Sequence, residues 1–237
     1  MDIIDLVTSN QKNILLFLLT VSAFLLASYV YRKGNQHVLL QPLLISVILV
    51  VGALLVFEIP YAQYIAPNKL LQWLLGPAVV SLAIPMYQNL THIRQWLPMV
   101  LVTIVVSAAL GVVVTGGISL AMGFEFSTQV AMVTKSATTP IALSINEVLK
   151  GHLALAALVV MFTGLLGAVI GPMLLNQFGF DDHRIQGVAL GLTSHAIGTQ
   201  KAMEISPVCG AFSALAMTLT GVFLSIFLPL VDYFLTR

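Results

Sequence analysis

The sequence has 237 residues, of which 59% are hydrophobic and only 8% are charged, and its mean hydropathy is +1.01. No soluble domain of this length has such a composition, so we predict a membrane protein. The formal net charge of +1 excludes the strongly basic surface that is typical of nucleic-acid-binding proteins. Cys209 is the only cysteine, so no disulfide can form within the chain.

The N-terminal region lacks the basic stretch and the cleavage site of a signal peptide, so the first apolar run is expected to remain as a span. A helix needs about 17–25 apolar residues to cross about 30 Å of hydrocarbon. Five segments satisfy this requirement without interruption: residues 13–31, 38–57, 97–122, 153–175 and 209–234. Three more are apolar but contain Pro, Gly or charged residues, and we interpret them as broken, re-entrant or cavity-lining: residues 70–90, 128–149 and 184–205.

We therefore expect an all-α polytopic membrane protein with about eight membrane segments in a single integral membrane domain over residues 1–237. An internal inverted repeat is one hypothesis, because residues 41–46 resemble residues 139–144. The repeat halves would be about residues 38–122 and 128–205. The alternative is chance similarity between stretches that are rich in Leu and Val.

The first polar interruption lies within residues 134–144, where Pro140 removes one backbone donor and favours an extended Thr139. A helix that begins there would present free N–H groups and a partial positive charge to an anion, and Lys135 would add a full charge. The alternative is that the hydroxyls bond to the preceding helical turn and that Lys135 snorkels to the interface. The candidate binding residues are Lys135, Ser136, Thr138, Thr139 and Pro140.

The second interruption lies within residues 187–204. On a helix, His195 and Thr199 share one face, while Gly198 permits a kink or a close backbone approach. The candidate binding residues of this segment are Ser194, His195, Gly198 and Thr199, and His195 is also a candidate proton carrier. The alternative is a neutral histidine that is hydrogen-bonded between helices. Lys201 and Glu204 are candidates for gating or coupling, or they form an interfacial ion pair.

Two further residues are weaker candidates for gating or coupling. Ser81 lies in the third interrupted segment, whose prolines predict an irregular crossing. Glu58 ends the second span beside tyrosines, which is the ordinary composition of a membrane interface.

Common catalytic and nucleotide-binding motifs are absent from the sequence. It contains no GxxxxGK[ST], HExxH or GxSxG motif and no paired-cysteine metal site. We therefore expect neither an enzyme nor an ATP-driven pump, and we expect no cofactor and no metal.

Four segments carry a resemblance to the LrgB/CidB family of bacterial membrane proteins: residues 75–87, 135–142, 194–199 and 210–217. The resemblance covers most of the chain from about residue 35. It implies a multi-pass protein of the bacterial inner (cytoplasmic) membrane. Plant relatives carry glycolate and glycerate across the plastid envelope, and bacterial members are linked to control of murein hydrolase activity and lysis, often beside a small holin-like partner. The chain departs from the family where Thr134 replaces Pro and where residues 146–151 replace a Gly-rich stretch.

The resemblance thus implies a secondary transporter of small organic anions such as glycolate, glycerate or pyruvate-like carboxylates. It would work by alternating access, with coupling to H⁺ or Na⁺, as a homo-oligomer in the lipid bilayer. Ser136, Thr138, Thr139 and Thr199 would bind carboxylate and hydroxyl oxygens. The alternative is a non-transporting regulator of murein hydrolase activity and lysis that acts with a holin-like partner. The transporter hypothesis requires that the two interruptions meet around a wet pocket midway through the bilayer.

Overall fold

The computed structural model describes residues 3–34 and 40–235, which form helices joined by short connections and contain no strand. The chain divides into two compact units, Met1–Ser81 and Leu82–Arg237. Five helices in the described part are long and apolar enough to cross a membrane: Gln11–Lys33, Lys69–Gln88, Leu90–Ala121, Leu153–Gln177 and Pro207–Phe234. The prediction of an all-α polytopic membrane protein is therefore confirmed.

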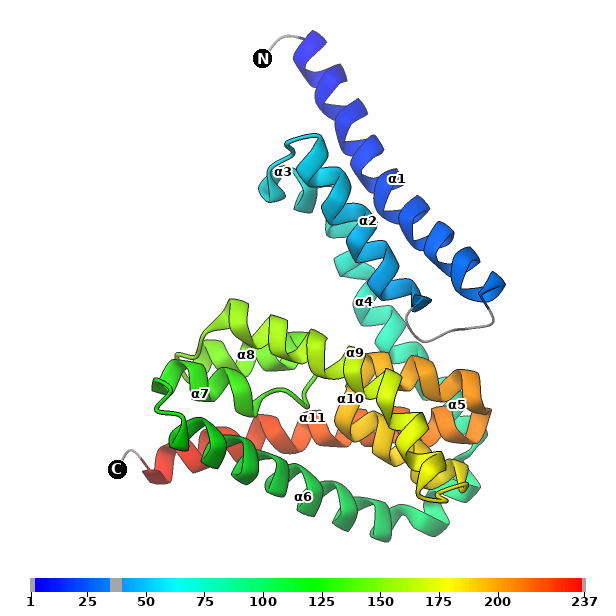
Figure 1. The fold of residues 1–237 in the computed structure, drawn as a ribbon, viewed down its shortest axis with the longest axis vertical. Coiled ribbons are helices and arrows are strands. Elements are labelled where there is room, and N and C mark those ends of the chain that lie inside the picture. The colour runs from blue at the N-terminus through cyan, green and yellow to red at the C-terminus, as the bar shows by residue number, and fades with distance from the viewer. Residues whose placement is uncertain (1–2, 35–39, 236–237) are drawn as a thin grey trace. The chain divides into compact units, whose positions relative to one another are not determined.

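The first unit contains α1 (Ile3–Lys33), α2 (Pro42–Val56), α3 (Tyr61–Ile65) and α4 (Lys69–Ser81), and α1 packs along α2 (Figure 1). The helix α2 is shorter than the predicted span of residues 38–57, and at 1.5 Å per residue it covers only about 22 Å. Pro42 fixes its start, and the chain leaves the helix at Glu58, whose φ is 51°. Residues 38 and 39 of the predicted span lie outside the described residues.

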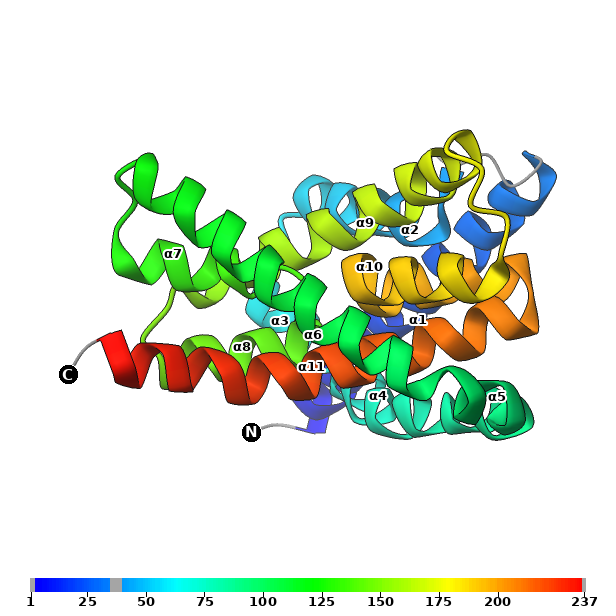
Figure 2. The same ribbon diagram turned by 90° about the horizontal axis from the view of Figure 1, so that it is seen from below.

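The second unit contains α5 (Ala83–Gln88), α6 (Leu90–Ala121), α7 (Phe126–Val133), α8 (Thr139–Val148), α9 (Leu153–Gln177), α10 (His183–Ile205) and α11 (Pro207–Leu235). The first half of α11 is the centre of the unit, because Ala211, Phe212 and Ala214 have no exposed surface. The α7–α8 pair and α10 pack against α11 near its opposite ends (Figures 1 and 2).

The predicted segment 128–149 does not cross the membrane but turns back. Neither α7 nor α8 is longer than about 15 Å, which is half the hydrocarbon thickness. The backbone N–H of His152, just after α8, donates to the carbonyl of Ser127, at the start of α7, over 3.0 Å. The two ends of the segment therefore lie side by side, and α7 and α8 form a re-entrant hairpin whose tip is residues 134–138.

The predicted segment 184–205 is a second hairpin, although α10 has no long interruption. His195 has φ 40° and ψ −126°, which breaks the helix in a conformation that non-glycine residues rarely adopt and that costs about 1–3 kcal/mol. Before the break, Gly187 lies against the carbonyl of Cys209; after it, Met203 lies against Gly210. Both halves of α10 therefore flank the same turn of α11, and the chain reverses at His195.

The bases of the two hairpins lie at opposite ends of α9. This helix separates them in the chain, and its 25 residues are sufficient for one full crossing. Each hairpin also follows a long apolar helix, so residues 90–148 and 153–205 share the same order of elements. These bounds differ from the sequence-based halves 38–122 and 128–205, which remain a prediction.

Candidate functional site

The tip of the first hairpin carries polar side chains that the protein does not engage. Lys135, Ser136, Thr138 and Thr139 are partly exposed, and within the described part of the chain none of their side chains has a hydrogen-bond partner. Thr138 is the N-cap residue of α8, yet no side chain caps this helix. Pro140 occupies the first turn. The tip therefore offers hydroxyls, one ammonium group and uncapped backbone N–H groups to a solute.

The base of this tip is held by a buried polar pair. The Nδ2 atom of Asn146 donates to Thr134 Oγ1 over 3.0 Å and to the carbonyl of Ala142 over 2.8 Å, and the side chains of Asn146 and Thr134 have no exposed surface. The bond between Asn146 and Thr134 therefore joins α8 to the residue that ends α7.

The tip of the second hairpin is almost fully buried. Ser194 has no exposed surface and His195 is 3% exposed. The His195 Nε2 atom lies 3.0 Å from the backbone carbonyl of Val160 on α9, so Nε2 is the donor. Thr199 bonds to the carbonyl of His195 over 2.8 Å and to Ser213 Oγ on α11 over 3.0 Å. The contacts of His195 correspond to the alternative reading, a histidine bonded between helices.

Both hairpins pack against α9. Val160, whose carbonyl accepts from His195, also belongs to the hydrophobic cluster that contains Ala137 and Ala142 of the first hairpin. The wet pocket between the tips, which the transporter hypothesis requires, stays a prediction. Two cavities of the second unit lie beside the tips and not between them.

The larger of these cavities is a groove of about 630 Å³ between α6 and the first half of α10. Arg184 stands at one end with its guanidinium 4.1 Å from the centre of the Trp96 ring. Thr193 at the other end lies 3.2 Å from Ser194 Oγ, next to the second tip. The side-chain hydrogen bond from Arg184 lowers the pKa of Asp182 to about 2, against an opposing effect of burial.

The remaining predicted residues fall into three groups: a pair at the end of α10, a glycine beside the second tip, and two residues of the first unit. Lys201 Nζ pairs with Glu204 Oε2 over 2.9 Å at the end of α10, which agrees with an interfacial ion pair. Gly198 packs so closely beneath the break that a Cβ there would lie 2.3 Å from the carbonyl of Leu190. Glu58 and Ser81 belong to the first unit, where Ser81 Oγ bonds to the carbonyl of Ala78 and Glu58 is exposed.

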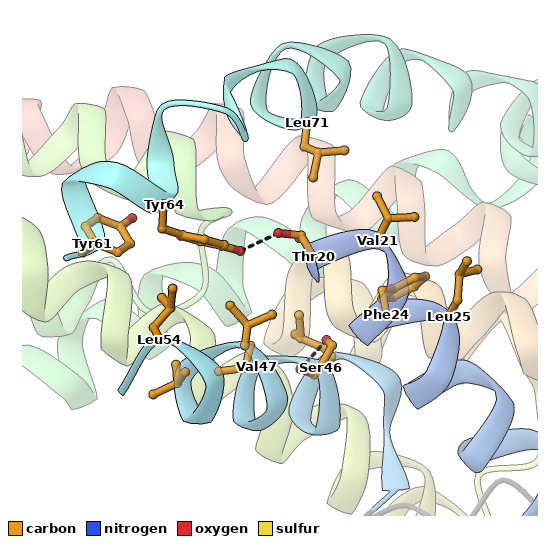
Figure 3. A pocket seen from close by; sticks show the side chains of 13 residues that line it. Thr20, Val21, Phe24, Leu25, Ser46, Val47, Leu54, Tyr61, Tyr64 and Leu71 are labelled. Carbon is orange, nitrogen blue, oxygen red and sulfur yellow. Dashed lines mark hydrogen bonds between the residues drawn. The ribbon is translucent and has the colours of Figure 1, made fainter. Parts of the chain in front are cut away.

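The first unit has an open cavity of its own, about 500 Å³ in volume, between α1, α2, α3 and α4 (Figure 3). Its polar feature is a hydrogen bond of 3.0 Å between Thr20 Oγ1 and the hydroxyl of Tyr64. Aliphatic and aromatic side chains such as Phe24 and Leu54 form most of the wall. The sequence did not predict this cavity.

Sequence reasoning also missed the partners of the second tip on α9. A Cβ at Gly164 would lie 2.4 Å from Cε1 of His195, and one at Gly167 would lie 2.0 Å from Ser194 Oγ. A Cβ at Gly171 would lie 2.9 Å from Leu190. The signal was present as glycines spaced three and four residues apart, which marks a close helix contact in a membrane. The described residues contain no cluster of His, Cys, Asp and Glu that is suited to a metal ion.

Comparison with known proteins identifies the family of this chain. The model of the LrgB-like family matches residues 20–234. The chain is 34% identical to uncharacterized protein YwbG of Bacillus subtilis, over 86% of this chain and 90% of that protein. It is 35% identical to uncharacterized protein YxaC of the same organism, over 92% and 94%, and 32% identical to holin-like protein CidB of Staphylococcus epidermidis, over 91% and 94%. No solved structure shows significant similarity. This chain is thus a member of the LrgB-like family.

Proposed function

We propose that this protein carries small organic anions across the bacterial inner membrane by alternating access. The observation that supports the proposal is the pair of hairpins at opposite ends of α9, both of which pack against this helix. Backbone breaks at membrane depth persist only against protein or around a polar cavity, and secondary transporters use them to hold solutes.

The first tip is the better candidate for contact with the solute. Lys135 would balance the charge of a carboxylate, and the hydroxyls of Ser136, Thr138 and Thr139 would bind its oxygens together with the N–H groups of α8. At the second tip, Ser194 and Thr199 are already bonded within the protein. Their contribution is therefore to hold the wall of the site, and solute access to them requires a change at the break of α10.

The names of the relatives favour a second function. The relatives from Staphylococcus epidermidis and Staphylococcus aureus bear the name holin-like protein CidB, and this name mentions no solute. It supports a holin-like role more directly than it supports carboxylate transport. In that role the protein would regulate murein hydrolase activity together with a small holin-like membrane partner, and the polar tips would serve only as contacts between helices.

Uptake by purified protein in liposomes separates the two functions. Radiolabelled glycolate, glycerate and pyruvate are offered under an imposed H⁺ gradient, then a Na⁺ gradient, then neither. We expect uptake above that of empty liposomes for at least one anion, and a large loss of it in Lys135→Ala and Thr139→Ala. Ser225→Ala is the matched control, because this exposed hydroxyl on α11 bonds only to its own helix.

Binding supplies a second measurement that needs no gradient. A solute at one hundred times its Kd stabilises the folded protein by about 2.7 kcal/mol through mass action. Addition of the transported anion should therefore raise the unfolding midpoint of the wild-type protein. The same addition should leave the midpoint of Thr139→Ala unchanged. If none of the three anions is taken up and none stabilises the protein, the transport proposal is contradicted and the holin-like role remains.

The same liposome samples address assembly. We propose a homo-oligomer, and cross-linking at low protein density in the bilayer measures the number of chains. Co-purification with a small holin-like membrane protein tests the second function directly.

A further inference from the structure

The break of α10 is the most unusual backbone feature of the second unit. The described residues contain three non-glycine positions with positive φ, namely Glu58, Lys150 and His195. Glu58 and Lys150 lie in exposed connections, whereas His195 is buried inside a helix. A strained conformation at such a site persists only where the surroundings impose it, and it points to a functional constraint.

Three contacts with α9 impose this conformation. The imidazole lies against Gly164, where even a methyl group would lie 2.4 Å from Cε1 and 2.8 Å from Nε2. Its Nε2 atom bonds to the carbonyl of Val160, one helical turn earlier. The preceding residue, Ser194, packs in the same way against Gly167. The ring of His195 therefore occupies a notch that exists only because residue 164 has no side chain.

We propose that His195 is a positioning residue, and that its ring, the Gly164 notch and the Val160 carbonyl form a joint that holds the tip of the α10 hairpin on α9. A carbonyl can only accept, so the proton of the neutral ring is on Nε2. That proton is already engaged with the protein. On this view His195 acts through the placement of the tip and does not carry protons for a solute. The inference concerns the site of the proposed function but holds whatever solute is moved.

A double-mutant cycle tests the notch. In the wild-type background, Gly164→Ala pushes a methyl group into the imidazole ring, and we expect the unfolding equilibrium constant to rise at least about fivefold. In His195→Ala the ring is absent, and the nearest remaining atom is Cδ1 of Ile197 at 2.9 Å, the movable end of a side chain, so the rise should fall below about twofold. Gly111→Ala on α6 is the matched control, because no atom lies within 4 Å of a Cβ there. Equal effects of Gly164→Ala in both backgrounds would overturn the joint.

Conservative replacements test the hydrogen bond. In His195→Gln the terminal amide nitrogen reaches the position of Nε2 and donates to the Val160 carbonyl, whereas in His195→Asn the shorter side chain does not reach it. Spin labels on cysteines introduced at Thr103 and Thr193 report the distance between α6 and the tip, since the native Cys209 is buried. We expect the wild-type distance distribution in His195→Gln and a broader or shifted one in His195→Asn. Identical distributions in these two variants would overturn the role of Nε2.

A spectroscopic measurement addresses the tautomer. Nitrogen-15 NMR of histidine-labelled protein should show a neutral ring protonated at Nε2, and this signal should disappear in His195→Gln. Assignment of the proton to Nδ1 would overturn the donor role. None of these measurements uses a solute, so absence of transport would not affect the result, and a failed cycle would leave the transport assay open.

Discussion

The buried pair of Thr134 and Asn146 allows the hairpin geometry to be tested quantitatively. Thr134→Val keeps the shape of the side chain and removes its hydroxyl. The structure then loses two hydrogen bonds, one from Asn146 Nδ2 over 3.0 Å and one to the carbonyl of Ala131 over 2.9 Å. The Asn146 amide keeps its bond to the carbonyl of Ala142. It is therefore left with one unpaired hydrogen and is not fully stranded.

The magnitude follows from these contacts. Hydrogen bonds between helices in membrane proteins contribute about 0.6 kcal/mol on average and at most about 1.7 kcal/mol. The loss of two bonds by Thr134 and the partly unpaired amide give an expected destabilisation of about 1–2 kcal/mol, or about 5–30-fold in the unfolding equilibrium. Asn146→Leu likewise loses two hydrogen bonds, but it also removes the buried Oδ1 atom, which has no partner in the described structure, so its cost should be smaller than that of Thr134→Val.

Equilibrium unfolding in mixed detergent micelles measures this effect. Trp96 in the second unit is a suitable fluorescent reporter once the exposed Trp73 is replaced by Phe. Thr103→Val on α6 is the control, because its exposed hydroxyl bonds only to the preceding turn, and we expect a change below about 0.5 kcal/mol. The reasoning would be refuted if Thr134→Val and Asn146→Leu proved additive within about 0.3–0.5 kcal/mol, since directly bonded residues must couple.

Three further predictions concern α10. Gly191→Ala places a Cβ 2.1 Å from the carbonyl of Ser213, so α10 and α11 must separate. We expect a destabilisation of more than about 2 kcal/mol in the same unfolding assay, and a neutral result would contradict the observed packing of the two helices. Thr199→Val loses its bonds to His195 and Ser213 and should cost about 1 kcal/mol, whereas Thr199→Ser should remain close to wild type. Asp182 has a pKa of about 2, below its ordinary value of 3.8, so its stabilising contribution is present above pH 3.8 and is lost as the pH falls towards 2. In Asp182→Asn the side chain can still accept from the backbone N–H of Arg184, but the acid dependence of the unfolding midpoint should disappear. If the acid dependence persists, it arises from another carboxylate.

The amino-acid sequence alone determined the class of protein and the location of its breaks. Composition and the length of the apolar runs are sufficient to predict membrane helices, because hydrocarbon requires continuous apolar surface and internally bonded backbone. Pro140 with its neighbouring hydroxyls and Gly198 with His195 marked the two interruptions, since these residue types are costly at membrane depth. The sequence also placed α6, α9 and α11 close to their observed bounds.

The tertiary structure decided what each break does. Residues 128–149 and 184–205 are long enough to cross a membrane but carry polar interruptions, and the contacts of His152 with Ser127 and of Met203 with Gly210 show that the chain turns back in each. The difference between the tips is also tertiary: Lys135 has no partner in the described structure, whereas His195 is bound to Val160. The local sequence shows that a polar residue such as His195 is costly in the membrane. Its hydrogen-bond partner, Val160, lies 35 residues away in the chain, and only folding brings the two together.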